Sequence, residues 1–523
     1  MDKYKTIFEE RLERHNYRMQ ETVEEDMVEL TRALFEETFD KLKKKPGDKY
    51  KFITMAGESL KVALFHLYSI VWKKESIPKE WSESTVIQLK KVNYHSNDLN
   101  DFRHIHTRTE YAKFLGQMVL TLAKPSIFAN MPKYQIACRP GHRATEHLFI
   151  IKSVIAKYLE EKRGLLLINW DISKMFDKED IYFCLDQIAA SVKVKVYRLL
   201  YHMNKDGKVK VKTPVGMTPA EKVDPGLTQG SVEAAVISSA AIGKGADDTF
   251  SNKAGVISYE SVPLPFQIFM DDCLKASDDV KHAQTANNMM EELMGKAGLQ
   301  LNLDKSCYMM VGSQKNRRKF KAQLENSPIK LSDELMKEVK TMKFLGDSLS
   351  FNLEESVHQT VVKRVAVARQ AVYEIRTVIE DTRAGKNGAL GLAFDIWEQG
   401  ILPMILWNSG SWIGIAKRTI KILDSLFHFF CQIVCRLSVS CPKPSYYTET
   451  GSLKFSYHIL LNKLRLCHHL ANLPTGALGR EFWDIQAEKK SLSWLYKETE
   501  SYLETLNICD LKKISKWSYK KLT

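Results

Sequence analysis

The sequence predicts an α+β protein in which strands and helices alternate up to about residue 350 and helices alone follow. Two segments indicate strands: the apolar run at residues 165–170, and the segment 266–274, in which two acids interrupt short apolar runs. From Val357 onward, apolar residues recur with helical periodicity and strand signals are few. We therefore expect a sheet-containing part that is followed by a helical part.

The composition is that of a soluble globular protein with an excess of basic residues. Of its 523 residues, 77 are Lys or Arg and 63 are Asp or Glu, which gives a net charge of +14. Such an excess suits a polyanionic partner. No apolar run reaches the roughly 20 residues of a membrane span, and the N-terminal residues are charged rather than apolar. The nine cysteines show no paired spacing. We expect no membrane partner, free thiols, and an intracellular location in nucleus and cytoplasm.

Residues 1–50 are highly charged and predict a helical extension. Thr22 and Glu25 have the spacing of a capping box, and Leu30 and Leu34 fall on the apolar face of the helix that this box would begin. The elements expected further on are a helix at 60–72, strands at 85–89 and 165–170, a helix at 180–190, an alternating strand at 208–212, a helix that Ser277 caps and Gly298 ends, and a strand at 299–303.

The segment 266–274 carries the adjacent acids Asp271 and Asp272. Adjacent residues on a strand point to opposite faces, so a second carboxylate for one site must come from elsewhere. Asp171, which ends the apolar run 165–170, is the candidate. Asp171 and Asp271 could hold two Mg²⁺ ions about 3.5–4 Å apart, the arrangement that clamps the attacking and leaving oxygens of phosphoryl transfer. Taken alone, an acidic pair of this kind is more often a solvated turn.

A series of segments resembles, in order, the motifs of a reverse transcriptase of the non-LTR retrotransposon (LINE-like) or group II intron type. The segments are 77–91, 100–103 and 135–141, the palm motifs at 171–177, 226–231, 269–272 and 298–305, the hairpin at 344–346, and the segment 401–412. Each motif alone is a weak signal, whereas their order and separations together are specific. The likeness covers roughly residues 50 to 475.

The resemblance implies a right-hand polymerase fold with fingers, a palm and a helical thumb. The palm would be an antiparallel sheet with helices on one face. The expected parts are an N-terminal helical extension at 1–50, fingers and palm at 51–350, a thumb at 351–400, and a C-terminal helical region at 401–523.

The resemblance also implies an RNA-directed DNA polymerase, a nucleotidyltransferase that extends a primer 3′-hydroxyl with dNTPs. Its partners would be an RNA template and a DNA primer or target. Asp171, Asp271 and the main-chain carbonyl of Ile172 would hold two Mg²⁺ ions, with Mn²⁺ as the alternative. Asp272 would add charge and orient the site, and Lys305 would donate a proton to the leaving pyrophosphate.

Five further residues would contact the nucleotide. Lys90 and Arg103 would hold the triphosphate, and Phe176 would exclude a ribose 2′-hydroxyl. Gln229 and Gly230 would lie against the nucleotide and template. The alternatives are a solvated surface lysine at position 90, a core aromatic at position 176 and a plain turn at positions 229 and 230.

Departures from the family pattern keep other functions open. Ser231-Val232-Glu233 follows the glutamine and glycine of the second palm motif, where the family usually has proline, and residues 135–139 lack a glycine and an aromatic residue of the family segment. One alternative is a catalytically impaired or host-retained reverse-transcriptase-like protein that binds RNA. Another is a helical scaffold that binds protein through residues 357–523. An endonuclease would lie on a missing segment or act in trans.

Overall fold

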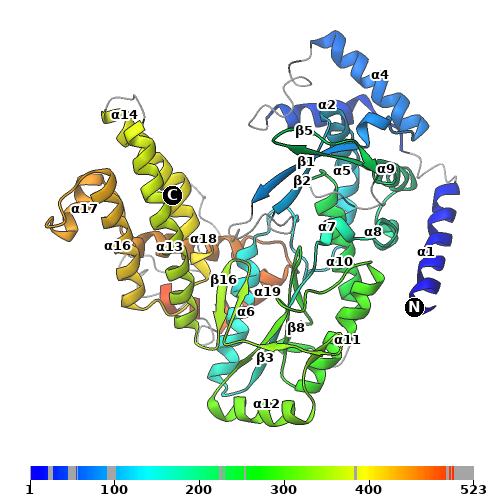
Figure 1. Ribbon diagram of the computed structural model, residues 1–523. Coiled ribbons are helices and arrows are strands. Elements are labelled where there is room, and N and C mark those ends of the chain that lie inside the picture. The colour runs from blue at the N-terminus through cyan, green and yellow to red at the C-terminus, as the bar shows by residue number, and fades with distance from the viewer. Residues whose placement is uncertain are drawn as a thin grey trace.

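The computed structural model describes residues 2–21, 28–44, 55, 57–90, 102–222, 227, 230–251, 255–381, 386–489, 494–495 and 497–499. Its architecture has three parts (Figure 1). The first part lies above the sheet that contains β3 (Leu165–Asp171); it is built around β1 (Glu83–Lys90), β2 (Phe102–Arg108), α2 (Arg32–Lys43) and α4 (Glu58–Lys74). On the far side from α1 (Asp2–Gln20) stand α13 (Leu353–Asp381), α14 (Lys386–Ile396), α16 (Lys417–Val434) and α17 (Lys443–Thr450). We refer to these parts as fingers, palm and thumb.

The palm is a five-stranded sheet in the order β14-β11-β3-β10-β9. Its strands are β3 (Leu165–Asp171), β9 (Gln267–Phe269), β10 (Asp272–Ser277), β11 (Cys307–Val311) and β14 (Lys337–Glu338). All neighbours are antiparallel except β11 and β14. The first six residues of β3 are buried, as a continuous apolar run in a central strand should be, and only its last residue, Asp171, reaches the surface.

Helices pack on the palm sheet and fix the direction of its side chains. Trp170 points to the face covered by α10 (Ala234–Phe250) and α11 (Val280–Lys296), where it stacks on Phe250 and donates to Asn287. Asp171 therefore points to the other face. On that face α6 (Ala144–Glu160) reaches β9 through His147, which hydrogen-bonds Gln267. The other helices of the fingers and palm are α5 (Glu110–Asn130), α7 (Met175–Lys178), α8 (Ile181–Ile188), α9 (Val194–Asn204) and α12 (Gln314–Asn326).

The fingers contain a second sheet in the order β2-β1-β4-β5, with β6 also paired to β4. Its strands are β1 (Glu83–Lys90), β2 (Phe102–Arg108), β4 (Lys208–Thr213), β5 (Gly216–Met217) and β6 (Glu221–Lys222). Three two-stranded hairpins complete the strands: β7 (Ile257–Tyr259) with β8 (Val262–Leu264), β12 (Lys330–Leu331) with β13 (Glu334–Leu335), and β15 (Thr341–Phe344) with β16 (Asp347–Ser350). No strand follows Ser350 in the described residues, as the sequence predicts.

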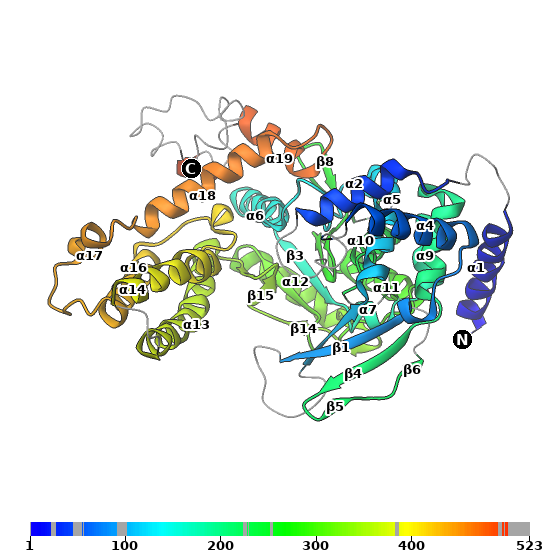
Figure 2. The ribbon, with the colours of Figure 1, turned by 90° about the horizontal axis from the view of Figure 1, so that it is seen from above.

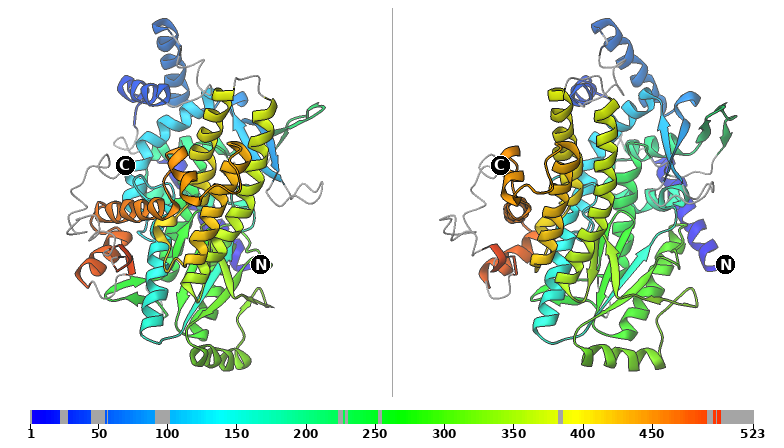
Figure 3. Two further views of the ribbon diagram at one scale, coloured as in Figure 1. Left: turned by 90° about the vertical axis from the view of Figure 1, so that its left-hand side faces the viewer. Right: turned by 60° about the vertical axis from the view of Figure 1, so that its left-hand side comes forward.

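The helices after residue 350 divide between two hydrophobic cores. They are α13 (Leu353–Asp381), α14 (Lys386–Ile396), α15 (Leu402–Ile405), α16 (Lys417–Val434), α17 (Lys443–Thr450), α18 (Phe455–Ala471) and α19 (Leu478–Glu488). Residues 357–459 share one core, whereas the second half of α18 and all of α19 pack into the main core of fingers and palm. Figures 2 and 3 show α18 and α19 crossing from the thumb to the palm beside α6.

The N-terminal helices differ from the predicted start at Thr22. α1 (Asp2–Gln20) packs on α8. α2 (Arg32–Lys43) is capped by Thr31, whose side chain accepts a hydrogen bond from the backbone N–H of Leu34. Residues 28–31 are not helical, so the predicted face from Leu30 to Leu34 does not form on one helix, and the predicted cap itself lies outside the described residues. α4 (Glu58–Lys74) follows. None of the helices in the described residues has the length and hydropathy that crossing a bilayer requires.

A buried carboxylate fastens the C-terminal helices to the palm. Glu146 at the start of α6 accepts hydrogen bonds from His142 at 2.9 Å and His469 of α18 at 2.7 Å. Burial opposes ionisation of Glu146, but these two hydrogen bonds outweigh it and lower its pKa to about 2.

The low pKa of Glu146 predicts a loss of stability in acid. A carboxyl with a depressed folded-state pKa stabilises the fold fully above its unfolded pKa, and the stabilisation disappears as the pH falls from about 4.5 toward 2. The loss should amount to about 3 kcal/mol. We expect the urea unfolding free energies of the wild type and Glu146→Gln to differ most at pH 7, to differ by less than half as much at pH 3, and to converge by about pH 2. A constant difference across that range would contradict the assignment.

Candidate active site

The three acids of the palm motifs meet at one edge of the sheet. Asp171 is the last residue of β3, and it lies directly opposite Asp272, the first residue of β10. Directly opposed residues on antiparallel strands share a face, so these two carboxylates project to the same side. Asp271 stands in the two-residue turn between β9 and β10, beside Met270, which has a left-handed backbone with φ of +59° and accepts a hydrogen bond from Ser239 of α10.

The carboxylates repel one another in a partly dry setting. Burial raises the pKa of Asp171, the Lys305 ammonium opposes this shift, and Asp271 adds to it. Burial, followed by the charge of Asp271, raises the pKa of Asp272 to about 6. Hard divalent cations prefer oxygen ligands, and a bound cation would neutralise the negative charge of these acids. The donor set therefore fits Mg²⁺ or Mn²⁺.

The described residues contain no group of three or more His, Cys, Asp or Glu side chains arranged to hold an ion unaided. An ion at this edge would therefore use the acids of β3 and the β9–β10 turn together with backbone oxygen, water and substrate phosphate. Mg²⁺ commonly keeps several such ligands.

The backbone carbonyl of Ile172 points to the side of β3 on which β10 lies. The backbone of Asp171 accepts from Asn302, and Ser173 donates to the carbonyl of Gln300, so the neighbours of Ile172 are hydrogen-bonded toward residues 300–302. Backbone groups alternate in direction along a strand, so the carbonyl of Ile172 points the opposite way, toward β10. This orientation fits the predicted metal ligand.

Two lysines provide positive charge beside the acids. Lys305 Nζ lies 3.7 Å from Asp171 Oδ2 and keeps 66% of its side chain exposed. Lys343 of β15 is exposed, and its charge opposes the raised pKa values of both Asp171 and Asp272. The sequence prediction missed Lys343. The signal available was its place just before the Phe344-Leu345-Gly346 hairpin, but only the fold shows that the hairpin faces the carboxylates.

Two of the predicted nucleotide residues of the palm, Phe176 and Gly230, lie in the described part of the chain. Phe176 is half-buried on α7 and packs against the main core. Gly230 has φ of +107°, and a Cβ there would come within 2.4 Å of the His106 carbonyl on β2, so a glycine is required for this close approach. Gln229 lies outside the described residues.

Lys90 and Arg103 lie at the end of the β1–β2 hairpin where the chain passes from β1 to β2, and their side chains leave opposite faces of it. Lys90 pairs with Phe102 and Leu89 pairs with Arg103. Residues that pair directly share a face, and so do residues two apart on one strand. Lys90 therefore lies on the face of Arg108, which is buried against Glu233 at the start of α10, and Arg103 lies on the opposite face. The register thus separates the two side chains that the sequence prediction placed on one triphosphate.

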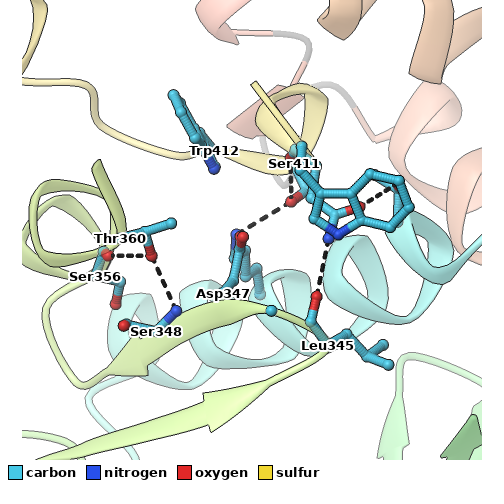
Figure 4. Close-up of polar contacts among 12 residues, drawn as sticks. Leu345, Asp347, Ser348, Ser356, Thr360, Ser411 and Trp412 are labelled. Carbon is cyan, nitrogen blue, oxygen red and sulfur yellow. Dashed lines mark hydrogen bonds and ion pairs between the residues drawn. The ribbon is translucent and has the colours of Figure 1, made fainter. Parts of the chain in front are cut away.

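A buried polar network positions the β15–β16 hairpin against the carboxylates (Figure 4). Asp347 accepts from Lys152 of α6 at 2.8 Å and from Arg364 of α13 at 2.7 Å. Lys152 also donates to Ser411, and Asn408 donates to the carbonyl of Leu345. Palm, thumb and the segment 408–411 therefore hold the turn of this hairpin together.

The hairpin's other strand is bonded to the thumb helix. The backbone of Ser348 donates to Thr360 (Figure 4). The backbone of Ser350 donates to Ser356. The hairpin that carries Lys343 is thus bonded to both α6 and α13.

Comparison with known families identifies the class of domain. Residues 89–349 match the family model described as reverse transcriptase (RNA-dependent DNA polymerase). The chain therefore contains a reverse transcriptase domain, the domain of RNA-directed DNA polymerases, which are nucleotidyltransferases. This match and the α+β architecture confirm the predicted fold class and enzyme class.

The chain is also similar to solved telomerase structures. A Candida tropicalis telomerase truncated from its C-terminal domain is 11% identical, with a TM-score of 0.35, and the match covers 55% of this chain and 59% of that one. Candida albicans telomerase in complex with a TWJ fragment of telomeric RNA is 10% identical, with a TM-score of 0.36 and coverage of 80% and 68%. Apo telomerase from Candida tropicalis is 10% identical, with a TM-score of 0.38 and coverage of 84% and 74%. No curated protein sequence matches the chain.

Proposed function

We propose that this protein is an RNA-directed DNA polymerase that copies an RNA template by extending a DNA primer with dNTPs, and that it is of the non-LTR retrotransposon type. The observation that carries the proposal is the direct pairing of Asp171 with Asp272 beside the turn that bears Asp271, inside a reverse transcriptase domain. The non-LTR assignment is supported by the sequence likeness of the motif at 298–305 and the segment 401–412 to that type.

In the proposed reaction, the primer 3′-hydroxyl gives up its proton to water and its oxygen forms a bond to the α-phosphorus of the nucleotide, while the bond from that phosphorus to the oxygen bridging to the β-phosphate breaks and pyrophosphate leaves. Two Mg²⁺ ions, when bound, would activate the attacking oxygen and neutralise the leaving one. In this proposal Asp171, Asp271 and the Ile172 carbonyl would supply the oxygen ligands. Lys305 would give a proton to the departing pyrophosphate, a role that its exposure and its 3.7 Å distance from Asp171 support.

Lys90 is the better placed of the two cations proposed for the triphosphate. It lies on the face of the β1–β2 hairpin that also carries His106 and Arg108, and that face turns toward Gly230 and α10. A lysine at the end of a strand presents a mobile point charge that suits phosphate.

The departure at Ser231-Val232-Glu233 has a structural explanation. The Ser231 hydroxyl accepts from the N–H of Ala234, and Glu233, only 1% exposed, pairs with Arg108 at 2.8 Å. Glu233 thus connects the fingers to the start of α10, and this contact holds the segment in place without the family's proline.

Primer extension tests the proposal directly. Wild-type protein with an RNA template, an annealed DNA primer, dNTPs and Mg²⁺ should give full-length product that EDTA abolishes. RNA binding without any extension would overturn it and favour the alternative, an impaired reverse-transcriptase-like protein that binds RNA. No binding to nucleic acid beside a stable protein complex would favour the scaffold alternative.

Phe176 is expected to set the choice of sugar. If its ring lies under the nucleotide ribose, Phe176→Val should increase incorporation of ribonucleotides relative to deoxynucleotides by about 10–100-fold, since a pocket contact of this size is worth about 1–3 kcal/mol. The ratio of kcat/KM for rNTP and dNTP measures the effect. An unchanged ratio with reduced stability would show that Phe176 is a core aromatic instead.

A further inference from the structure

The alternating segment of β4 has no part in the proposed chemistry. Lys208 lies opposite Glu83 of β1, and Lys210 lies opposite Thr85. Residues two apart on a strand share a face, so Lys208, Lys210 and Lys212 all project to one side of the fingers sheet. The valines between them point to the other side.

Neighbouring strands add cations to the same side. Lys222 of β6 lies opposite Lys208, and Arg103 of β2 shares the face of Leu89 and Thr85. We call this set the lysine face; its members are Arg103, Lys208, Lys210, Lys212 and Lys222. Among the described sheet residues the register puts one acid there, Glu83, whose carboxylate pairs with Lys210 at 2.7 Å.

The lysine face also exposes apolar side chains. Ile87, Leu89 and Met217 lie on this side by register and are 42%, 52% and 50% exposed. The other side of the same sheet is packed: Val86 is buried there, and Arg108 is buried against Glu233. Figure 2 shows β1 and β4 at the rim of the molecule, with α5 and α10 behind them.

We propose that the lysine face binds a single strand of nucleic acid. Three lysines in a row on β4, about 6.8 Å apart along the strand, form a linear array of charge that suits a linear polyanion. The exposed apolar side chains of Ile87, Leu89 and Met217 can contact the bases of a single strand, whereas the bases of a duplex are stacked inside it. This surface accounts for the position of Arg103, which the register turns away from Lys90.

Substitutions at three lysines without an ion-pair partner among the described residues test the proposal. The variant Lys208→Gln/Lys212→Gln/Lys222→Gln is compared with a control that removes three exposed lysines of α12, Lys315→Gln/Lys319→Gln/Lys321→Gln. Affinity for a fluorescent single-stranded RNA oligonucleotide is measured across a salt series. Each lost phosphate contact should reduce the slope of log K against log salt by about 0.7, so the test variant should lose about 2 and the control nothing.

The same oligonucleotide as a duplex, and anionic phospholipid vesicles, identify the occupant. The proposal requires the test variant to lose single-strand affinity selectively. Equal slopes in test and control variants, or a selective loss of duplex or vesicle binding, would overturn it. The binding does not depend on synthesis, so the slopes are measured without primer, dNTPs or Mg²⁺, and the comparison holds even if no primer extension is found.

Discussion

Replacing Asp271 with asparagine is expected to reduce primer extension by about 10³-fold or more, equivalent to about 4 kcal/mol of activation free energy. Asparagine keeps the size of the side chain but removes the negative charge from the turn between β9 and β10. Burial, followed by the charge of Asp271, raises the pKa of Asp272 to about 6, so the Asp271 charge is part of the electrostatic setting of the site. The measurement is single-nucleotide incorporation on an RNA template, with Mg²⁺ varied.

The Asp271→Asn result has a matched control on the surface. Asp248→Asn removes one exposed carboxylate, which pairs with Lys244 on its own helix, and should leave extension unchanged. Asp271→Asn protein should also unfold at the wild-type temperature or slightly above it, since a repulsive charge has been removed. Equal activity of wild type and Asp271→Asn would show that the acids do not form the catalytic centre.

The strand ends that carry the acids could be predicted from local signals, and their meeting at one site was predicted from the resemblance to reverse transcriptases. A buried apolar run that ends in Asp171, and two short apolar runs around Asp271, each identify a strand end. The alternating segment at 208–212 likewise became β4. These patterns do not show which residues of two neighbouring strands pair with each other. Pairing Lys90 with Phe102 and not with Arg103 depends on how the hairpin packs on the palm, and a shift of one residue reverses every face.

Boundaries and long-range contacts were predicted less well than strand identity. Asp279, not Ser277, caps α11, because β10 continues through Ser277 and its hydroxyl bonds to the backbone of Asp279. The expected strand at 299–303 is reduced to a single bridge between Leu301 and Ile172, and the long strand beside β3 is β11 instead. Lys343 was missed because its proximity to Asp171 depends on the contact of the β15–β16 hairpin with the palm.

Loss of Asp347 is expected to be the most destabilising single change in the junction between palm and thumb. Asp347 is 1% exposed and neutralises two cations, Lys152, which is equally buried, and Arg364. Burial lowers the pKa of Lys152, and Asp347 opposes that shift. Asp347→Ala would leave Lys152 without its carboxylate in an apolar setting, so we expect a cost of about 3–5 kcal/mol.

The design that isolates this effect is a double-mutant cycle. Lys152→Met/Asp347→Leu is compared with Lys152→Met and Asp347→Leu alone. It removes the Lys152 charge together with its partner and should recover part of the stability that Asp347→Leu loses, because replacing a buried pair with apolar side chains is often neutral or favourable, while Arg364 still lacks its carboxylate. Arg364 retains its hydrogen bonds to the carbonyls of Ile405 and Trp407 in every variant. Thermal unfolding gives the stability, and hydrogen exchange of β15 and β16 shows whether the hairpin opens first. If Asp347→Ala costs no more than the exposed Asp248→Ala, at most about 0.5 kcal/mol, the network does not hold this junction.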